Sequence, residues 1–318
     1  MIIELILLTI VLFAIEFTYI KVSQHYKIVD LPNERSSHQI PTIRGGGLVF
    51  VIASFLFFLV HQFQFPYLIL AVFMAGFISF WDDVKSLSNK IRFIFHLASM
   101  LLVFCELDLF ELVSPIYLVL ALVVFIGILN AYNFMDGING ITALYSLSIL
   151  IPLMLTEANE SIQTLQYYLV VAILVFSFFN IRKVALVFAG DVGSIAMSLL
   201  IVYFMIFRII ETTNFTLIGL LLVYGIDTIY TLMYRITKRE NIFKAHRQHL
   251  YQYLTNEGKY SHTQIAFIYA MLQSAINFLL LNQQVNWYLF IGLIAVLSII
   301  YWKLKWKYIN LLANQSAA

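Results

Sequence analysis

The chain has 318 residues, of which 62% are apolar and 11% are charged, and its mean hydropathy is +0.89. A soluble domain of this length cannot bury so much apolar surface, so the composition excludes that class and favours an integral membrane protein. The net charge of +2 gives no indication of a nucleic-acid partner, and the single cysteine, Cys105, excludes an intrachain disulfide.

The apolar runs predict an all-α integral membrane protein with about eleven transmembrane helices in a single domain, residues 1–318. A hydrocarbon core of about 30 Å needs about 20 helical residues, and the runs approach that length without the alternation of a transmembrane strand. The predicted spans, in chain order, are 2–20, 46–62, 66–81, 93–106, 115–131, 141–156, 164–180, 193–209, 214–233, 263–281 and 286–302.

An odd number of spans places the two termini on opposite sides of the membrane. All Lys and Arg residues except Arg208 fall in loops on one side, whereas the loops on the other side are acidic. Because cytoplasmic loops carry an excess of Lys and Arg, the N-terminus is predicted outside and the C-terminus in the cytoplasm. No basic residue precedes the first span, which is therefore predicted to be a retained anchor rather than a cleaved signal peptide.

The first chemical motif is Asp82-Asp83-Val84-Lys85, at the predicted inner end of the third span. Two adjacent carboxylates can bind a hard cation through oxygen, or one can act as a base while the other orients a cation. Solvated charge at a helix end is the alternative interpretation.

The second motif, NAYNFMDGING at residues 130–140, joins the fifth and sixth spans. Its amides and its carboxylate suit a nucleotide or a metal-phosphate group, and Gly137 and Gly140 allow the backbone to approach a ligand closely. Asn and Gly also form ordinary turns, which remains the alternative.

The third motif, FAGDVGS at residues 188–194, lies directly before the eighth span. An aspartate between two glycines at a helix start resembles a metal ligand held near a phosphate. An N-cap aspartate would occupy the same position.

The fourth motif, HRQHLYQ at residues 246–252, lies in the long basic loop after the ninth span. Two histidines and an arginine could clamp a diphosphate through charge-assisted hydrogen bonds. A zinc site lacks both the glutamate of HExxH and a nearby cysteine, and an exposed basic face is the remaining alternative.

Two further places carry polar residues. Asp227 falls inside the ninth span, where a charge is costly unless it faces protein or water. His38 and Arg44 frame a polar segment that ends in the glycines 45–47, which would allow the second span to begin against a ligand. The acids, amides and cations share one predicted membrane face, which indicates a phosphoryl-transfer site open to the cytoplasm and to lipid.

In their order and placement, the four motifs resemble those of the polyprenyl-phosphate N-acetylhexosamine-1-phosphate transferases, over nearly the whole chain. That family includes the enzyme that makes the first lipid intermediate of peptidoglycan and those that start O-antigen, enterobacterial common antigen and teichoic acid. The resemblance implies a multi-pass enzyme of the bacterial cytoplasmic (inner) membrane that depends on Mg²⁺, with Mn²⁺ as an alternative. Its partners would be the bilayer, undecaprenyl phosphate and a UDP-N-acetyl sugar, with UMP as a product, and a homodimer is left open.

The resemblance also implies roles for individual residues. Asp191 would be the leading magnesium ligand, with Asp136 and Asp83 beside it. Asp82 and Asp83 would position or deprotonate the lipid phosphate, and the sequence leaves open which of them is the base. Asp227 would support the site without reacting. The further residues implied in catalysis or substrate binding are His246, Lys90, Asn130, Asn133, Arg247, His249, Arg44, His38 and Lys85.

Departures from the family pattern narrow the interpretation. Some relatives carry an aspartate where this chain has Ser86, and many carry one where it has Asn139. HRQHLYQ differs from the histidine-rich form of the peptidoglycan enzyme, which argues against UDP-MurNAc-pentapeptide as the donor. The motifs are more similar to enzymes that start O-antigen, capsule or exopolysaccharide repeats with 6-deoxy N-acetyl sugars, and UDP-GlcNAc is the main alternative donor.

A secondary transporter that uses intramembrane acids for ion coupling is the alternative of another class. Transporters place their sites near the bilayer midplane, often between internal repeats. Here nearly all candidate site residues lie at one face, only Asp227 among them is clearly buried within a predicted span, and no repeat is visible in the sequence. The sequence therefore favours the enzyme.

Overall fold

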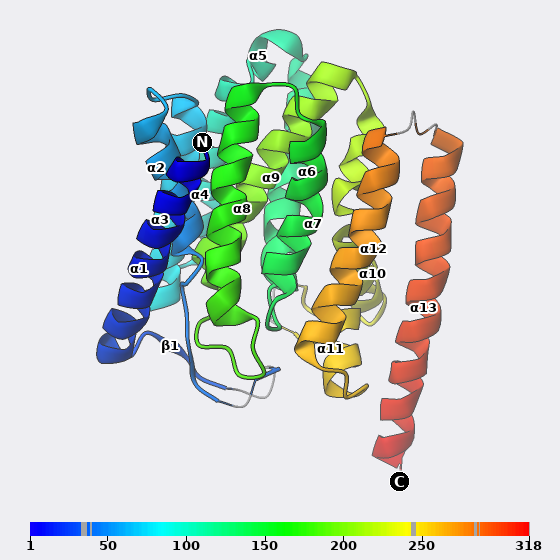
Figure 1. Ribbon diagram of the computed structural model, residues 1–318. Helices are drawn as coiled ribbons and strands as arrows, with labels where there is room; N and C mark the ends of the chain where they lie inside the picture. Colours follow the sequence, from blue (N-terminus) through cyan, green and yellow to red (C-terminus); the bar gives the residue numbers. More distant parts are fainter. Residues whose placement is uncertain (33–36, 39, 243–245, 283–284, 286, 318) are drawn as a thin grey trace.

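The computed structural model describes residues 1–318 except 33–36, 39, 243–245, 283–284, 286 and 318, and the described chain forms a bundle of long helices (Figure 1). The two termini lie at opposite ends of the bundle (Figure 1). In chain order the elements are α1 (Ile2–Tyr26), β1 (Val29–Asp30), β2 (Thr42–Ile43), α2 (Leu48–Val60), α3 (Pro66–Val84), α4 (Asn89–Glu106), α5 (Leu109–Leu112), α6 (Pro115–Met135), α7 (Ile141–Thr156), α8 (Glu160–Asn180), α9 (Gly190–Thr212), the 3₁₀ helix η1 (Phe215–Leu221), α10 (Leu222–Thr237), α11 (Leu250–Asn256), α12 (His262–Asn282) and α13 (Trp287–Ala317).

Each predicted span except the ninth coincides with one helix of the described chain, and the ninth is covered by η1 and α10, which confirms an all-α membrane protein. Within the described residues, eight helices, with η1 and α10 taken together, are long and apolar enough to cross a membrane, and α2 and α7 are shorter apolar helices. The predicted span 93–106 lies in α4, which begins earlier and carries Lys90 and Arg92 in its first turn. The number of spans and their orientation remain predictions from the sequence.

Two boundaries differ from the sequence prediction. Helix α13 continues to Ala317, well beyond the predicted end at residue 302, so Lys303, Lys305 and Lys307 are helical rather than part of a tail. Hydropathy ends a span at the first charge, but a helix continues while its backbone bonds are satisfied and a partner receives the charged side chain. The ninth predicted span is interrupted where η1 gives way to α10 at Leu222.

Local sequence explains where several helices begin. Proline occupies the first turn of α3 and of α6, where its missing N–H is no loss. Ser88 and Asn159 accept hydrogen bonds from the free amides at the starts of α4 and α8. These signals place the end of α3 beside the start of α4, with Asp82 and Asp83 at the junction.

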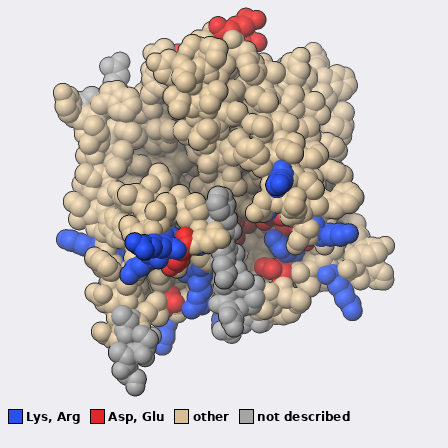
Figure 2. All heavy atoms as spheres, turned by 180° about the vertical axis from the view of Figure 1, so that it is seen from behind, with Lys and Arg blue, Asp and Glu red and all other residues tan. Residues whose placement is uncertain are grey.

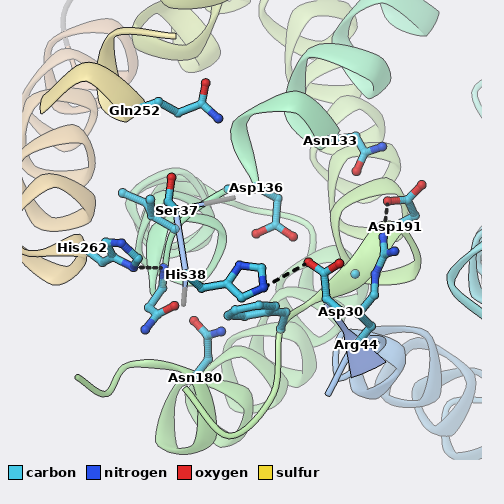
Figure 3. Close-up of a pocket in the computed structure, with 15 residues that line it drawn as sticks. Asp30, Ser37, His38, Arg44, Asn133, Asp136, Asn180, Asp191, Gln252 and His262 are labelled. Carbon is cyan, nitrogen blue, oxygen red and sulfur yellow. Dashed lines mark hydrogen bonds and ion pairs between the residues drawn. The ribbon is translucent and has the colours of Figure 1, made fainter. Parts of the chain in front are cut away.

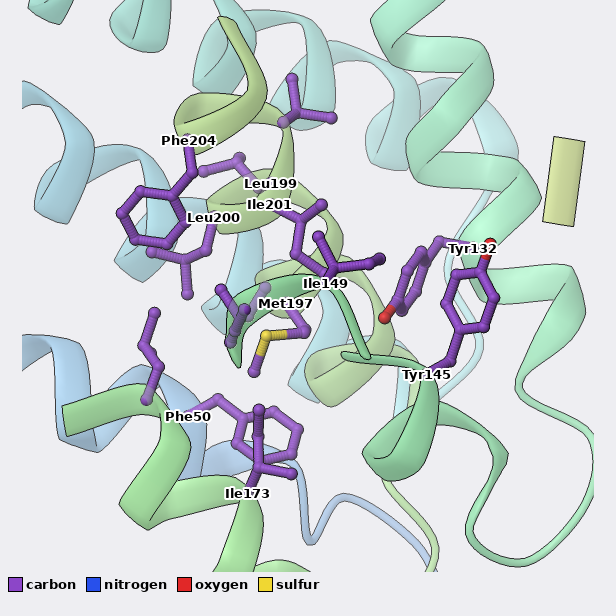
Figure 4. Packing of buried hydrophobic residues seen from close by; sticks show 14 of the residues in the cluster. Phe50, Tyr132, Tyr145, Ile149, Ile173, Met197, Leu199, Leu200, Ile201 and Phe204 are labelled. Carbon is purple, nitrogen blue, oxygen red and sulfur yellow. The ribbon is translucent and has the colours of Figure 1, made fainter. Parts of the chain in front are cut away.

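Helix α9 forms the centre of the bundle, since every residue from Val192 to Ile206 is buried. It packs against α3, α6, α2 and α7. Gly47 and Gly193 allow the starts of α2 and α9 to touch, because a Cβ atom on Gly47 would lie 2.1 Å from the Gly193 Cα. The side chains of this core that Figure 4 labels are Phe50, Tyr132, Tyr145, Ile149, Ile173, Met197, Leu199, Leu200, Ile201 and Phe204.

The segment between α1 and α2 is joined to the loop before α9. Strands β1 and β2 pair antiparallel, and the Ile43 carbonyl accepts a hydrogen bond from the Phe188 amide at 2.8 Å. The amides of Gly46 and Gly47 donate in turn to the carbonyls of Phe188 and Ala189, each at 2.9 Å. This backbone ladder brings Arg44 to the N-terminus of α9.

Candidate active site

A pocket of about 220 Å³ opens where α6, α8 and α9 meet the segment between α1 and α2. Figure 3 shows Asp30, His38, Asp136 and Asp191 around this common space. The residues that line it are Asp30, Ser37, His38, Arg44, Asn133, Asp136, Gly137, Ile138, Asn139, Asn180, Phe188, Gly190, Asp191, Gln252 and His262.

The pocket belongs to the basic end of the molecule. In Figure 2 most Lys and Arg side chains of the visible face gather in the lower half, where several Asp and Glu side chains also lie, and further carboxylates lie at the upper extreme. The lower half is the end at which Figure 1 shows β1 and α11. A positive end of this kind favours anionic substrates and anionic lipid head groups.

Beside the pocket, Asp191 lies between two guanidinium groups. Arg44 places Nη2 at 3.0 Å from Asp83 Oδ1 and at 3.5 Å from Asp191 Oδ1. Arg92 places Nη1 at 2.9 Å from Asp82 Oδ2 and at 3.3 Å from Asp191 Oδ2. The three aspartates and two arginines therefore form one charged cluster that joins α3, α4 and α9.

Within this cluster, Asp83 caps the N-terminus of α9. Its Oδ1 accepts a hydrogen bond from the Asp191 amide at 3.0 Å, and its Oδ2 accepts one from the Val192 amide at 3.1 Å. A carboxylate is favoured at the positive end of a helix, and the Asp83 side chain is fully buried there. Asp82 is more accessible, and its Oδ1 accepts a hydrogen bond from the Leu87 amide at 2.5 Å.

Gly190 makes this cap geometrically feasible. Its φ of +71° is a conformation that residues with a side chain rarely adopt, and a Cβ atom there would lie 2.4 Å from Asp83 Oδ2. Gly190→Ala should lower the free energy of unfolding by about 1–2 kcal/mol from the backbone conformation alone, and the collision with Asp83 adds to this.

Thermal unfolding in detergent measures this loss. Gly225→Ala is the matched control, because a Cβ atom at Gly225 in α10 meets nothing within 4 Å. The control should melt at the wild-type temperature or slightly above it. Equal melting temperatures for the two variants would contradict the assigned role of Gly190.

Helix α6 and the loop after it supply the opposite wall. Asn133 accepts a hydrogen bond from the Ser194 hydroxyl at 2.7 Å, and Asp136 accepts one from the Thr142 hydroxyl at 2.5 Å. Burial raises the pKa of Asp136 to about 6, although the Thr142 hydrogen bond opposes the shift. A buried carboxylate of this kind gains from a cationic ligand, which would favour its charged form.

The histidine loop is anchored by Asp227. The Asp227 Oδ1 accepts hydrogen bonds from the Leu250 amide at 2.9 Å and from His249 Nδ1 at 3.3 Å. Its Oδ2 accepts from the Tyr251 amide at 3.3 Å and the Tyr269 hydroxyl at 2.9 Å. Asp227 therefore caps the N-terminus of α11 and fixes the start of the helix that carries Gln252 to the pocket.

The two histidines stack on each other, with ring centroids 5.0 Å apart. Burial, together with the nearby charge of His249, lowers the pKa of His246 to about 3, so its ring is neutral at pH 7. His246 Nδ1 accepts a hydrogen bond from the Gln248 amide at 3.3 Å, which places the proton on Nε2. His249 Nε2 is buried without a hydrogen-bond partner among the described residues, so it can form a hydrogen bond with a ligand.

Other residues singled out from the sequence lie outside the pocket lining. Lys85 and Lys90 are exposed. Asn130 donates its amide to the Ile126 carbonyl of its own helix at 2.8 Å, and Arg247 pairs with Glu257 at 3.5 Å. His38 does line the pocket, where its Nε2 lies 3.8 Å from Asp30 Oδ2. The basic residues Arg35 and Lys244 lie outside the described residues.

Several residues in the pocket lining or beside it are not assigned a role from the sequence. Arg92 was noted only as a loop cation, although its spacing of ten residues from Asp82 allows a contact across the α3–α4 turn. Asn180 holds the Gly140 amide at 2.7 Å, and His262 accepts from the Asn139 amide at 3.4 Å. The Asn139 side chain donates to the Arg182 carbonyl at 3.0 Å, so it supports the loop. Asp30 and His262 lie far from every motif, so no local pattern indicates them.

The oxygen donors of the pocket decide whether a magnesium ion would fit there. Among the described residues, no three side chains of His, Cys, Asp or Glu converge as a group that could hold a metal ion. Asp83, one of the three predicted metal ligands, instead accepts hydrogen bonds from backbone amides of α9 with both of its carboxylate oxygens. Asp136, Asp191 and Asn133 nevertheless offer oxygen atoms to one pocket. Mg²⁺ is ordinarily held by one or two carboxylates together with waters and substrate phosphates, so this set fits an ion that arrives with its substrate.

Comparison with known proteins agrees with the geometry. The model of a family described as glycosyl transferase family 4 matches residues 65–209, a range that includes all four aspartates Asp82, Asp83, Asp136 and Asp191. A phospho-N-acetylmuramoyl-pentapeptide-transferase of Dictyoglomus thermophilum is 26% identical, over 62% of this chain and 70% of the relative. A probable undecaprenyl-phosphate N-acetylglucosaminyl 1-phosphate transferase of Bacillus subtilis is 24% identical, over 76% and 73%. An undecaprenyl-phosphate alpha-N-acetylglucosaminyl 1-phosphate transferase of Escherichia coli is 27% identical, over 85% and 80%.

Proposed function

Because the chain belongs to the superfamily of polyprenyl-phosphate N-acetylhexosamine-1-phosphate transferases, we propose that it transfers an N-acetylhexosamine 1-phosphate from a UDP-sugar to undecaprenyl phosphate. An oxygen of the lipid phosphate attacks the phosphorus that carries the sugar, the bond from this phosphorus to the UMP oxygen breaks, and UMP leaves. The products are undecaprenyl-diphosphate sugar and UMP.

The charged cluster around Asp191 is the observation that carries this proposal. Phosphoryl transfer asks little covalent chemistry of a protein, and it depends on positioning and on neutralising the charge of the phosphates. Arg44 and Arg92 supply two fixed guanidinium groups at the positive end of α9, beside a polar pocket at the basic end of the molecule. This arrangement suits a diphosphate that meets a lipid phosphate at the membrane surface.

The aspartates divide the work in this proposal. Asp83 is committed to the α9 amides and keeps Gly190 and Asp191 in place. Asp82 is the more accessible member of the pair, so it faces the lipid phosphate and accepts its proton where one is present. Asp191 and Asp136, with the Asn133 oxygen, would hold a magnesium ion. When bound, the ion neutralises charge on the transferring phosphoryl group.

The histidine loop completes the proposed site. His246 is neutral and presents a proton on Nε2, and His249 has a buried Nε2 without a partner among the described residues. The His246 Nε2 can donate a hydrogen bond to the diphosphate or the sugar, and the His249 Nε2 can accept one while its Nδ1 donates to Asp227. The rigid anchor at Asp227 keeps these atoms in place when no substrate is bound.

For the donor, we propose a UDP-N-acetylhexosamine without a peptide, because HRQHLYQ departs from the histidine-rich loop of the peptidoglycan enzyme. The enzyme would then act at the cytoplasmic face of a bacterial inner membrane. The initiation of O-antigen, capsule or another envelope polysaccharide is the proposed pathway. A 6-deoxy N-acetyl sugar and N-acetylglucosamine are the two donors to compare.

The test is UMP release by the purified protein in detergent with undecaprenyl phosphate, Mg²⁺ and a panel of UDP-N-acetylhexosamines, including UDP-MurNAc-pentapeptide. Release should require the lipid, should occur with one donor of the panel and should stop when EDTA removes the metal. Mn²⁺ added after EDTA tests the alternative ion. Silence with every donor, together with solute uptake by vesicles that contain the protein, would favour the transporter instead.

A further inference from the structure

Lys305 is a buried cation in a helix most of whose described residues face outward. It lies in α13, whose exposed apolar side chains include Ile291, Val296 and Ile299, whereas the Lys305 side chain is 0% exposed. A lysine is almost never fully buried unless it is paired. The buried ammonium therefore requires polar partners from the surrounding protein.

Two hydroxyl groups receive the Lys305 ammonium. Its Nζ donates to the Thr231 Oγ1 at 2.8 Å and to the Tyr301 hydroxyl at 2.6 Å. The rings of Tyr234 and Tyr301 also lie under it, at 5.4 and 5.1 Å from Nζ to the ring centroids. The cation thus joins α13 to α10 through Thr231.

The direction of the hydrogen bond between Lys305 and Thr231 follows from the donors that each group carries. An ammonium has donors only, so the Thr231 hydroxyl must accept from Lys305 and turns its own hydrogen elsewhere. The acceptors within reach are the Tyr301 hydroxyl at 3.0 Å, Asp227 Oδ1 at 3.3 Å and the Gln248 carbonyl at 3.4 Å. The Tyr301 hydroxyl also accepts from Lys305 and faces the Thr231 hydroxyl and the Asp227 carbonyl, at 3.0 and 3.5 Å. Both hydroxyls are thereby oriented toward the anchor of the histidine loop.

The anchor needs this support because its carboxylate is buried. The Asp227 side chain is only 2% exposed, and its nearest cationic partner, His249 at 3.3 Å, carries a charge only when protonated. A buried carboxylate requires hydrogen bonds and a compensating charge. Lys305 supplies that charge one hydroxyl away, in a network whose hydrogen bonds polarise one another.

We propose that Lys305 is a positioning residue for the reaction, acting through Thr231 and Asp227 to hold His246 and His249 at the diphosphate. Because it deepens the proposed function, this inference rests on that function. The last helix of the chain therefore takes part in the active site, although α13 contributes no residue to the pocket lining given above.

Lys305→Met should lower kcat/KM for the UDP-sugar by about tenfold or more, since small misplacements of positioning groups are costly. Lys305→Arg should recover part of this loss because it restores the charge. Thr231→Val, which removes only the hydroxyl, should act in the same direction as Lys305→Met. The matched control is Lys303→Met, an exposed lysine of the same helix, which should leave kcat/KM unchanged.

A double variant separates positioning from general destabilisation. In a background that carries His246→Ala, Lys305→Met should cost less than about twofold more, because the two residues act on one element. Full additivity would overturn the proposal. Wild-type kcat/KM in both Lys305→Met and Thr231→Val would also overturn it, and if Lys305→Met does not fold, Thr231→Val decides.

Limited trypsin proteolysis tests the loop without any reaction. Arg247 is largely exposed and lies between the two histidines. Cleavage after Arg247, identified by mass spectrometry, should be at least about threefold faster in Lys305→Met than in Lys303→Met at equal melting temperature. Unchanged cleavage would overturn the inference. If the wild type releases no UMP, the proposed function fails while this measurement still decides the role of Lys305 in the loop.

Discussion

Asp191→Asn should reduce UMP release by at least about a hundredfold, the loss typical of removing a preorganised charge from a transition-state site. The amide keeps the shape of the side chain but removes the charge that pairs with Arg44 and Arg92. It also removes a carboxylate from the oxygen donors that fit a magnesium ion. The initial rate at saturating donor and lipid measures the effect.

Glu160→Gln is the control for this substitution. Glu160 is exposed in the first turn of α8, the turn farthest along that helix from the pocket residue Asn180. The same loss of one charge there should change the rate by less than about twofold. Comparable rates for the two variants would show that Asp191 is not part of the active site. They would also contradict the placement of the active site at the basic end of the molecule.

The fold could be predicted from the sequence to a large extent, because a membrane makes hydropathy decisive. Each apolar run must satisfy its own backbone hydrogen bonds, and a helix does so locally. The end of α13 escaped this reasoning. Hydropathy ends the span at residue 302 and leaves Lys305 outside it, whereas the Lys305 ammonium is received by Tyr301 one turn earlier and by Thr231 of α10, which is distant in sequence.

The candidate site was predictable where chemistry and turn residues coincide, and less so elsewhere. Asp136 and Asp191 come from separate motifs, and the structure brings both to one pocket. The spacing of Asp83 from Asp82 could not show that one carboxylate caps a helix more than a hundred residues away. Their roles in the reaction remain predictions that the variants test.

Arg92 is the residue for which the structure departs furthest from the expectation, because the resemblance implies a role in catalysis or substrate binding for Lys90 and none for Arg92. Arg92 Nη1 bridges Asp82 and Asp191, and its Nη2 donates to Asn89 Oδ1 at 2.5 Å, which fixes the plane of the guanidinium group. We therefore expect Arg92→Met to lower kcat about a hundredfold, because two carboxylates lose a shared partner at the proposed site of phosphoryl transfer.

Arg92→Lys refines this prediction. Lysine keeps the charge but lacks the planar guanidinium group and the second nitrogen that reaches Asn89. The kcat of Arg92→Lys should therefore remain about tenfold below that of the wild type. Lys90→Met removes the neighbouring, exposed cation and should cost less than about threefold. A larger loss in Lys90→Met than in Arg92→Met would show that the lipid phosphate is held by the exposed lysine. The ion pairs of Arg92 would then have only a structural role. Both variants lose one positive charge from the first turn of α4, so the ratio of their kcat values does not depend on net charge.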